Sequence, residues 1–407
     1  MIDFELNETQ QQIKSFVHMF AEQMVRPISL VADRDHGLPP EFLARVNEMR
    51  NAFTMGAIPK EYGGEGDGAG GKDKKGGRSA NLTAAIGSEE MCWGDAAVVL
   101  TLPGPGLGGP PVRSMGTPEQ QERFFGVFQK PGLHWGAYGL TEPGAGSDVA
   151  AIRTTCVKDG DHWILNGTKC FITNGARADW VVIFATVDAA QGRAGHRAFV
   201  VEKGTPGFRI GKIEEKMGLR ASETAELVLE DARVPAANLL GGEDSYRTKE
   251  GFMGAMKTFD STRPLVGAMA IGIGRAAYEH ARDFVKEHYL LSRPVPRYRA
   301  IAERLARIAR RLDAARLLVW RAAWMADRGL ANAKEASMAK AYAGQAAIFA
   351  CIEAIEVCGA PGAAAGSDHA FLDKWFRDIK VFDIFEGTGQ IQRIVISKRI
   401  LSGLKSF

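Results

Sequence analysis

The segment from Phe385 to Arg393 contains the residue best suited to acid–base chemistry. It reads Phe-Glu-Gly-Thr-Gly-Gln-Ile-Gln-Arg and follows an apolar-rich stretch. A carboxylate between an aromatic ring and a bare glycine backbone is partly desolvated, which raises its proton affinity toward that of a useful base. Glu386 is therefore a candidate general base. Read by itself, it could instead be an acidic residue that caps the final helix.

Two loops upstream could hold a charged or flat ligand. Residues 138–148 read Tyr-Gly-Leu-Thr-Glu-Pro-Gly-Ala-Gly-Ser-Asp, and residues 171–175 read Phe-Ile-Thr-Asn-Gly. Glycines and a proline among hydroxyl groups make irregular loops whose exposed backbone N–H groups can bind a phosphate or the polar edge of a ring. For the first loop, a tight connection into a strand is the alternative reading.

Three domains are expected to position these loops. The spacing of apolar residues predicts a helical domain over 1–133, a small β-barrel domain over 134–241 and a helical bundle over 242–407.

Local signals predict individual elements within these domains. Asn7 followed by Gln10 predicts a capped first helix. Asn166-Gly167 predicts a hairpin turn between two strands. Further strands are expected near 180–187, 198–202 and 227–229. The Gly/Lys-rich residues 63–77 predict a solvated loop, with an anion-binding loop as the alternative.

Composition excludes several classes of function. The net charge of +3 on 407 residues is small, and no basic stripe is interleaved with aromatics, so a nucleic-acid partner is not expected. No membrane span is indicated. The five cysteines are scattered and form no C-x-x-C pair, which favours reduced thiols over disulfides or a zinc site. We therefore expect no metal and, since the N-terminus shows no signal-peptide pattern, a cytoplasmic location.

Together, several ordered motifs resemble those of the acyl-CoA dehydrogenase family, and the resemblance covers nearly the whole chain. Residues 138–148 match its Y-x-x-T-E-P-x-x-G-S-D signature, and 171–175 match its aromatic-I-T-N-G segment. Residues 217–222 are similar to its M-G-x-R motif. Residues 259–264 are similar to its F-D-x-T-R-P motif, and 385–392 to its E-G-T-x-Q-I-Q element.

The resemblance implies a site that binds FAD and an acyl-CoA thioester. Glu386 would remove the α-proton, and the position that carries the base in some branches is Thr262, which cannot serve. Cofactor contacts would come from Tyr138, Leu140, Thr141, Gly146, Ser147, Phe171, Thr173, Thr388 and Gln390. Substrate contacts would come from Ser147, Phe259, Asp260, Arg263 and Gly387. The resemblance also implies electron transfer to an electron-transferring flavoprotein, and a homotetramer whose neighbouring subunits complete each FAD site.

The sequence departs from the family pattern at the expected inter-subunit FAD contact. His288 stands where the family has an arginine, Leu291 where it has a phenylalanine, and Glu356 where it has a glutamine. Loss of a cation beside a diphosphate should weaken FAD binding. Either nearby arginines compensate, namely Arg293, Arg297 or Arg299, or the chain holds FAD weakly or in a heteromer.

A second departure is the segment 100–111, which contains Pro103, Pro105, Pro110 and Pro111. Four prolines are incompatible with the helix expected at the far end of the acyl pocket, so a turn-rich wall is predicted. Such a wall favours a short, branched or cyclic acyl group, and a surface connector is the alternative. Overall activity is predicted as α,β-dehydrogenation of an acyl-CoA. The alternatives are a non-oxidative acyl-CoA enzyme, a subunit of a heteromeric dehydrogenase, and an oxygen-using oxidase.

Overall fold

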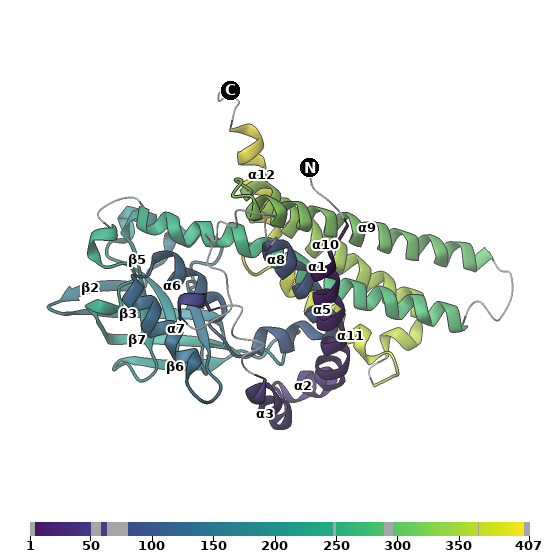
Figure 1. The fold of residues 1–407 in the computed structure, drawn as a ribbon, viewed down its shortest axis with the longest axis horizontal. Coiled ribbons are helices and arrows are strands. Elements are labelled where there is room, and N and C mark those ends of the chain that lie inside the picture. Colours follow the sequence, from purple (N-terminus) through teal and green to yellow (C-terminus); the bar gives the residue numbers. More distant parts are fainter. Residues whose placement is uncertain are drawn as a thin grey trace.

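Two helical regions flank a strand region in the chain order (Figure 1). The structure, a computed structural model, describes residues 5–49, 58–62, 80–246, 250–288, 296–364 and 366–402, with the backbone alone for 250–261 and 296–298. The predicted loop at 63–77 therefore lies outside the described residues. The N-terminal region contains α1 (Glu8–Phe20), α2 (Ser29–Asp35), α3 (Pro40–Glu48), α5 (Ala80–Thr101), α6 (Gly109–Met115) and α7 (Pro118–Gly126).

The first helix begins where the sequence predicts. The side chain of Asn7 accepts a hydrogen bond from Gln10 N at 2.9 Å, and the Gln10 side chain accepts one from Asn7 N at 3.1 Å. This reciprocal pair satisfies two N–H groups that have no partner inside the helix, so the predicted cap is confirmed.

Among the described residues, seven strands form one curled sheet in the order β1-β4-β2-β3-β7-β6, with β5 also paired to β4. The strands are β1 (Gly136–Gly139), β2 (Thr155–Asp159), β3 (His162–Thr173), β4 (Trp180–Thr186), β5 (His196–Glu202), β6 (Phe208–Ile213) and β7 (Thr224–Pro235). All seven residues of β4 are buried. Trp180, Val182 and Phe184 pack with Phe124 of α7 on one face, and the alternate residues Val181, Ile183 and Ala185 pack into the opposite cluster.

The hairpin predicted at Asn166-Gly167 is wrong. β3 runs unbroken through both residues, and the turn between β2 and β3 falls at Gly160, whose φ is 58°. At Asn166-Gly167 the pairing of β3 with β7 shifts register instead. Asn166 exchanges hydrogen bonds with Asp231 there, so its amide stabilises a β-bulge rather than a turn.

The C-terminal bundle consists of α8 (Glu250–His288), α9 (Pro296–Asp327), α10 (Ala333–Cys358), α11 (Ala370–Ile379) and α12 (Gly389–Leu401). In Figure 1, α8 runs from above the strands to the far end of the bundle, so it joins the two halves of the molecule. α10 is apolar and long enough to cross a membrane, but it packs against α8, α9 and α12 and most of its apolar window is buried. It is the core helix of the bundle.

Buried charges join the N-terminal helices to the bundle. Lys374 of α11 is 1% exposed, and its Nζ lies 2.5 Å from carboxylate oxygens of both Asp95 and Asp378. Asp95 interrupts α5 with an extended backbone and also accepts a hydrogen bond from the Ser29 hydroxyl of α2. These two carboxylates raise the pKa of Lys374 despite its burial, so the ammonium group remains charged.

Candidate active site

A large cavity lies where the strand region meets the bundle. Its volume is about 1120 Å³, and it is lined by residues of α1, α5, β1, β3, α8 and α12 and of several loops. Binding sites for one small molecule usually measure about 300–1,000 Å³. The cavity is therefore large enough for a flat cofactor and a second ligand together.

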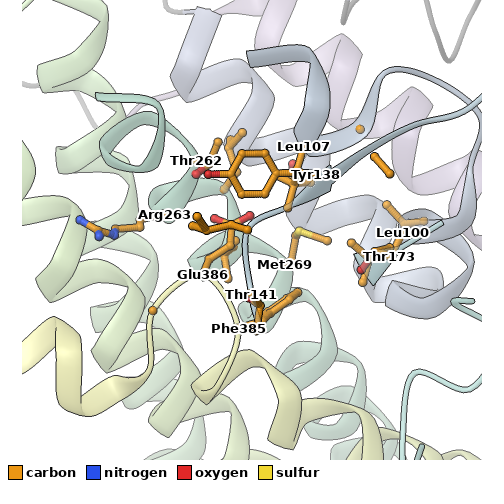
Figure 2. A pocket seen from close by; sticks show the side chains of 18 of the residues that line it. Leu100, Leu107, Tyr138, Thr141, Thr173, Thr262, Arg263, Met269, Phe385 and Glu386 are labelled. Atoms are coloured by element: carbon orange, nitrogen blue, oxygen red, sulfur yellow. The ribbon is translucent and has the colours of Figure 1, made fainter. Parts of the chain in front are cut away.

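Glu386 lines this cavity from the loop between α11 and α12 (Figure 2). Its φ is 52°, a left-handed conformation that is unfavourable for a residue with a side chain, and Gly387 follows with a φ of 93°. The side chain of Gln392 supports this turn by donating to the backbone oxygens of Glu386 at 3.2 Å and Gly387 at 2.9 Å. The backbone of this turn therefore fixes the direction of the carboxylate.

The electrostatics of Glu386 suit a base. Burial raises the pKa of its carboxyl above the ordinary value, while the Thr262 hydroxyl, Lys340 and Arg263 lower it. The Thr262 hydroxyl donates to the carboxylate, and the other oxygen, Oε2, has no hydrogen-bond partner among the described residues. A carboxylate at the wall of a cavity, with one oxygen that has no partner among the described residues, can accept a proton from a ligand bound there.

Lys340 of α10 was not predicted from the sequence. Its side chain is buried, and its Nζ donates a hydrogen bond to the backbone oxygen of Gly387 at 2.8 Å. Burial lowers the pKa of Lys340 to about 8, against the opposing effect of Asp383 and Glu386. A lysine within an alanine-rich helix has no local signal that marks it, because its contact is with a residue far along the chain.

The two predicted ligand loops meet at the same cavity. Tyr138, Leu140, Thr141, Gly146 and Ser147 line it from the first loop, and Phe171 and Thr173 from the second. Phe171 is 61% exposed with a φ of 58°. Burial, and to a smaller extent Glu386, raise the pKa of the Tyr138 phenol, which therefore remains protonated.

A buried ion pair fixes the first loop. Lys169 of β3 is fully buried, and its Nζ lies 2.6 Å from Glu142 Oε1 and donates to Leu140 O at 3.3 Å. The Glu142 carboxylate also accepts from the backbone N–H groups of Arg153 at 2.6 Å and Thr154 at 2.9 Å. The Thr141 backbone oxygen accepts from Cys170 N at 3.0 Å, so the loop is tied directly to β3.

Other predicted site residues have mixed outcomes. Arg263 and Gly387 line the cavity. Thr388 caps α12 by accepting from Ile391 N, and Gln390 is exposed on the same helix; neither lines the cavity. The side chains of Phe259 and Asp260 lie outside the described residues. The cavity is also lined by Arg193, Lys398 and Arg399, none of which was predicted from the sequence to belong to the site.

The proline-rich segment 100–111 contributes a cavity wall, as predicted. Leu100, Leu102, Leu107 and the residues between Pro103 and Gly106 line it. The prediction that the prolines prevent a helix is wrong for the last two of them. Pro110 and Pro111 lie in the first turn of α6. There, proline removes N–H groups that have no partner inside the helix and presets the backbone angle.

Two of the three departures at the expected inter-subunit contact, His288 and Glu356, lie among the described residues. His288 is exposed at the end of α8 and stacks on Phe284, with ring centroids 4.1 Å apart. Glu356 pairs with Arg304 of α9. Arg299 is exposed and pairs with Glu303. Leu291, Arg293 and the side chain of Arg297 lie outside the described residues.

The residues present fit a flavin dinucleotide beside an acyl thioester. An exposed aromatic ring and the threonines at 141 and 173 border the cavity, and Asn174 Oδ1 is buried without a hydrogen-bond partner among the described residues. Four cations, Arg193, Arg263, Lys398 and Arg399, also line it and match anionic phosphates. Among the described residues that line this cavity, Glu386 is the one carboxylate, so the site combines a single candidate base with room for a cofactor and a second ligand.

Comparison with known proteins identifies the family. Residues 7–128, 137–232 and 249–401 match the N-terminal, middle and C-terminal domains of acyl-CoA dehydrogenases. Acryloyl-CoA reductase (NADH) of Anaerotignum propionicum is 38% identical, with 98% of this chain and 96% of the relative covered. The chain belongs to the acyl-CoA dehydrogenase family.

Two solved structures share the fold. Butyryl-CoA dehydrogenase of Megasphaera elsdenii has a TM-score of 0.84 and 33% identity, with 98% of this chain and 100% of that chain covered. A chain in a structure of the electron transferring flavoprotein of Acidaminococcus fermentans has a TM-score of 0.85 and 37% identity, with the same coverage. The predicted family and fold class are thereby confirmed.

Proposed function

We propose that this protein is an FAD-dependent dehydrogenase of a short acyl-CoA thioester, with Glu386 as its base. The observation that carries the proposal is the buried Glu386 carboxylate, which has a raised pKa and one unpartnered oxygen at a cavity of about 1120 Å³. A base with a raised pKa retains enough proton affinity to accept the α-proton of a thioester at neutral pH.

In this proposal, several residues at the cavity have separate roles in the reaction. The Glu386 carboxylate accepts the α-proton, and the Thr262 hydroxyl and Lys340 hold the carboxylate charged and in place. The backbone N–H of Glu386 polarises the thioester oxygen, which stabilises enolate-like charge. Phe171, Thr141 and Thr173 would hold the flavin ring, and the cations at the cavity would meet phosphates. FAD bound there would supply the acceptor for the β-hydrogen as hydride.

The substrate is proposed to be short, branched or cyclic because Pro103, Pro105 and the glycines between them form a wall of the cavity. Two of the similar proteins carry names with three- and four-carbon acyl groups, acryloyl and butyryl, which supports the short option.

An electron-transferring flavoprotein is the proposed acceptor, supported by the similar chain in the Acidaminococcus structure. A homotetramer in the cytoplasm completes the proposal. All five cysteines are free and buried thiols, which supports a reducing compartment.

The test is anaerobic titration of the purified flavoprotein with acyl-CoA thioesters, with flavin absorbance as the readout. Butyryl-CoA and branched or cyclic thioesters should bleach the flavin, and Glu386→Gln should abolish bleaching while retaining bound flavin. Bound flavin that no thioester bleaches would favour a non-oxidative acyl-CoA enzyme. Protein purified without flavin, and unable to take it up, would instead favour a subunit that depends on a partner.

A further inference from the structure

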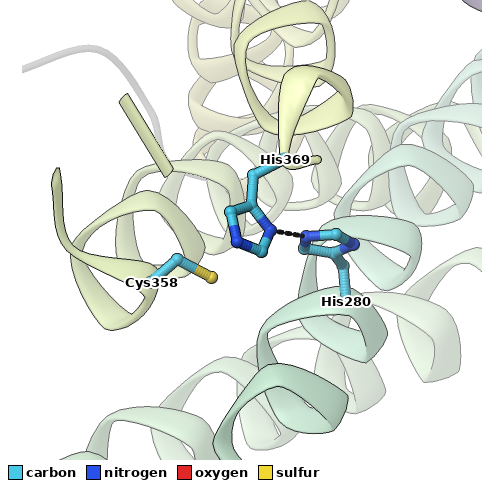
Figure 3. A group of neighbouring side chains, drawn as sticks. All are labelled: His280, Cys358 and His369. Atoms are coloured by element: carbon cyan, nitrogen blue, oxygen red, sulfur yellow. Dashed lines mark hydrogen bonds between the residues drawn. The ribbon is translucent and has the colours of Figure 1, made fainter. Parts of the chain in front are cut away.

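A second group of reactive side chains lies at the end of the bundle away from Glu386. His280 of α8, Cys358 at the end of α10 and His369 just before α11 face one another (Figure 3). One ligand atom from each residue lies within 4.8 Å of the others, and His280 Nε2 is 2.8 Å from His369 Nδ1. None of the three lines the large cavity, and Cys358 lies two residues after Glu356 of the expected inter-subunit FAD contact.

Sequence reading expected no metal because no two cysteines are closely spaced. That criterion detects sites built within one loop, whereas these residues come from α8, from the end of α10 and from the turn before α11. The fold brings them together through the tight turn after α10, where Gly359 has a φ of 71°.

The group is enclosed by the protein. Cys358 is 2% exposed, and His280 and His369 are half-buried. The rings of Phe284 and Trp375 border the two imidazoles, with centroids 5.2 Å and 6.0 Å away. A site enclosed in this way protects metal–thiolate bonds from solvent.

The ligand set selects the kind of metal. Two imidazoles and one thiolate are typical ligands of Zn²⁺, with bonds of about 2.0–2.1 Å to nitrogen and about 2.3 Å to sulfur. In a tetrahedral site these bond lengths place neighbouring ligand atoms roughly 3.3–3.6 Å apart. The separations in the group, 2.8 Å between the two imidazole nitrogens and at most 4.8 Å between any two ligand atoms, bracket that range. We propose that His280, Cys358 and His369 bind a zinc ion, with a solvent molecule as the fourth ligand.

Zinc binding should change the protonation of its ligands, and the protons released can be measured. Cys358 must lose its thiol proton to become a thiolate, and the hydrogen bond between the two imidazoles must give way to two lone pairs directed at the metal. Zinc binding should therefore release protons and strengthen as pH rises. The plain alternative is a histidine–histidine hydrogen bond beside an inert thiol, and it predicts neither effect.

The experiment uses the full chain as purified, without a histidine tag and under reducing conditions. Zinc is offered in competition with a chromophoric chelator. We expect about one equivalent bound per chain, a rise in melting temperature with zinc, and proton release in weakly buffered solution. Co²⁺ in place of zinc should give tetrahedral absorption bands in the red, where oxidised flavin does not absorb.

Variants separate this site from adventitious binding. Cys358→Ser, His280→Gln and His369→Gln should each weaken zinc affinity by more than the roughly 10–100-fold that loss of an outer partner costs. Cys351→Ser, a buried cysteine two turns earlier on the same helix, should retain wild-type affinity. Because His369 is only half-buried, its variant should fold even if the others do not. Wild-type protein that binds no zinc, or a His369→Gln variant that binds it equally well, would overturn the proposal.

Discussion

The Nζ atom of Lys340 lies 2.8 Å from the backbone oxygen of Gly387, the residue that follows the candidate base. This contact joins the core helix of the bundle to a turn in which Glu386 has a left-handed backbone. Lys340 therefore acts in two ways, since its hydrogen bond holds the turn and its charge lowers the pKa of Glu386.

Replacement of Lys340 by methionine should slow turnover without preventing ligand binding. The turn loses its anchor, and small displacements of a reacting group can cost on the order of 10²-fold in rate. kcat should fall by about this factor while KM changes little. Lys380→Met removes an exposed lysine near the same segment and should leave both constants unchanged. An unaltered kcat in Lys340→Met would show that Gln392 alone holds the turn.

Substitution of Glu386 by glutamine should reduce turnover by at least about 10³-fold, within the range that loss of a general base produces. The amide is nearly the same size, so bound flavin and binding of a substrate analogue should persist. Glu230→Gln, which affects an exposed glutamate paired with Arg209, provides the control. Turnover near wild type in Glu386→Gln would assign the base elsewhere.

The pH profile of kcat/KM should report the Glu386 carboxyl. Its pKa is raised by burial, and only the carboxylate is active, so activity should fall as pH decreases at a higher pH than for an exposed glutamate. Thr262→Val removes a hydrogen bond that favours the charged form, so the acid limb should move further toward higher pH. Thr168→Val, on β3 away from the cavity, should leave the profile unmoved. A shift to lower pH in Thr262→Val would contradict this assignment.

Acyl-chain selectivity should follow the proline-rich wall. Each methylene that cannot enter forfeits about 0.8 kcal/mol of burial, roughly fourfold in kcat/KM per carbon. Four-carbon and cyclic thioesters should therefore be preferred over linear eight-carbon ones. Leu107→Ala should improve the eight-carbon substrate several-fold, whereas Leu317→Ala, on α9 and similarly exposed, should not. A wild-type preference for linear chains of eight carbons or more would place the wall outside the acyl site.

Retention of FAD should increase when His288 is replaced by arginine. The exposed imidazole stacks on Phe284 at the end of α8, in the position where the family has a cation for the diphosphate. The arginine side chain is longer and always charged, so it should lower the FAD dissociation constant and raise the melting temperature in added FAD. Asn47→Arg adds the same charge on exposed α3 and controls for net charge. Equal FAD affinity in wild type and His288→Arg would show that other groups hold the diphosphate.

Sequence reading succeeded where the signal is local or carried by an ordered motif. The cap formed by Asn7 and Gln10 and the joint placement of Thr141, Phe171, Thr173 and Glu386 at one cavity are of this kind. It failed where tertiary pairing overrides a local preference. Asn166-Gly167 is a strong turn signal, but pairing with Asp231 across β7 makes it a bulge.

Some residues at the site had no sequence signal for their role. Lys340 contacts a turn far along the chain, and Thr262 was considered only as a residue unable to act as a base. Both roles depend on how α8 and α10 pack beside the loop before α12, which periodicity and motif spacing do not specify.

The buried Lys374 constrains the order in which the chain acquires its structure during synthesis. Asp95 leaves the ribosome well before Lys374, and without that ammonium its buried carboxylate is an uncompensated charge. The ion pair that joins α5 to α11 therefore forms only after α11 has been synthesised, and until then the packing of the N-terminal helices lacks this contribution.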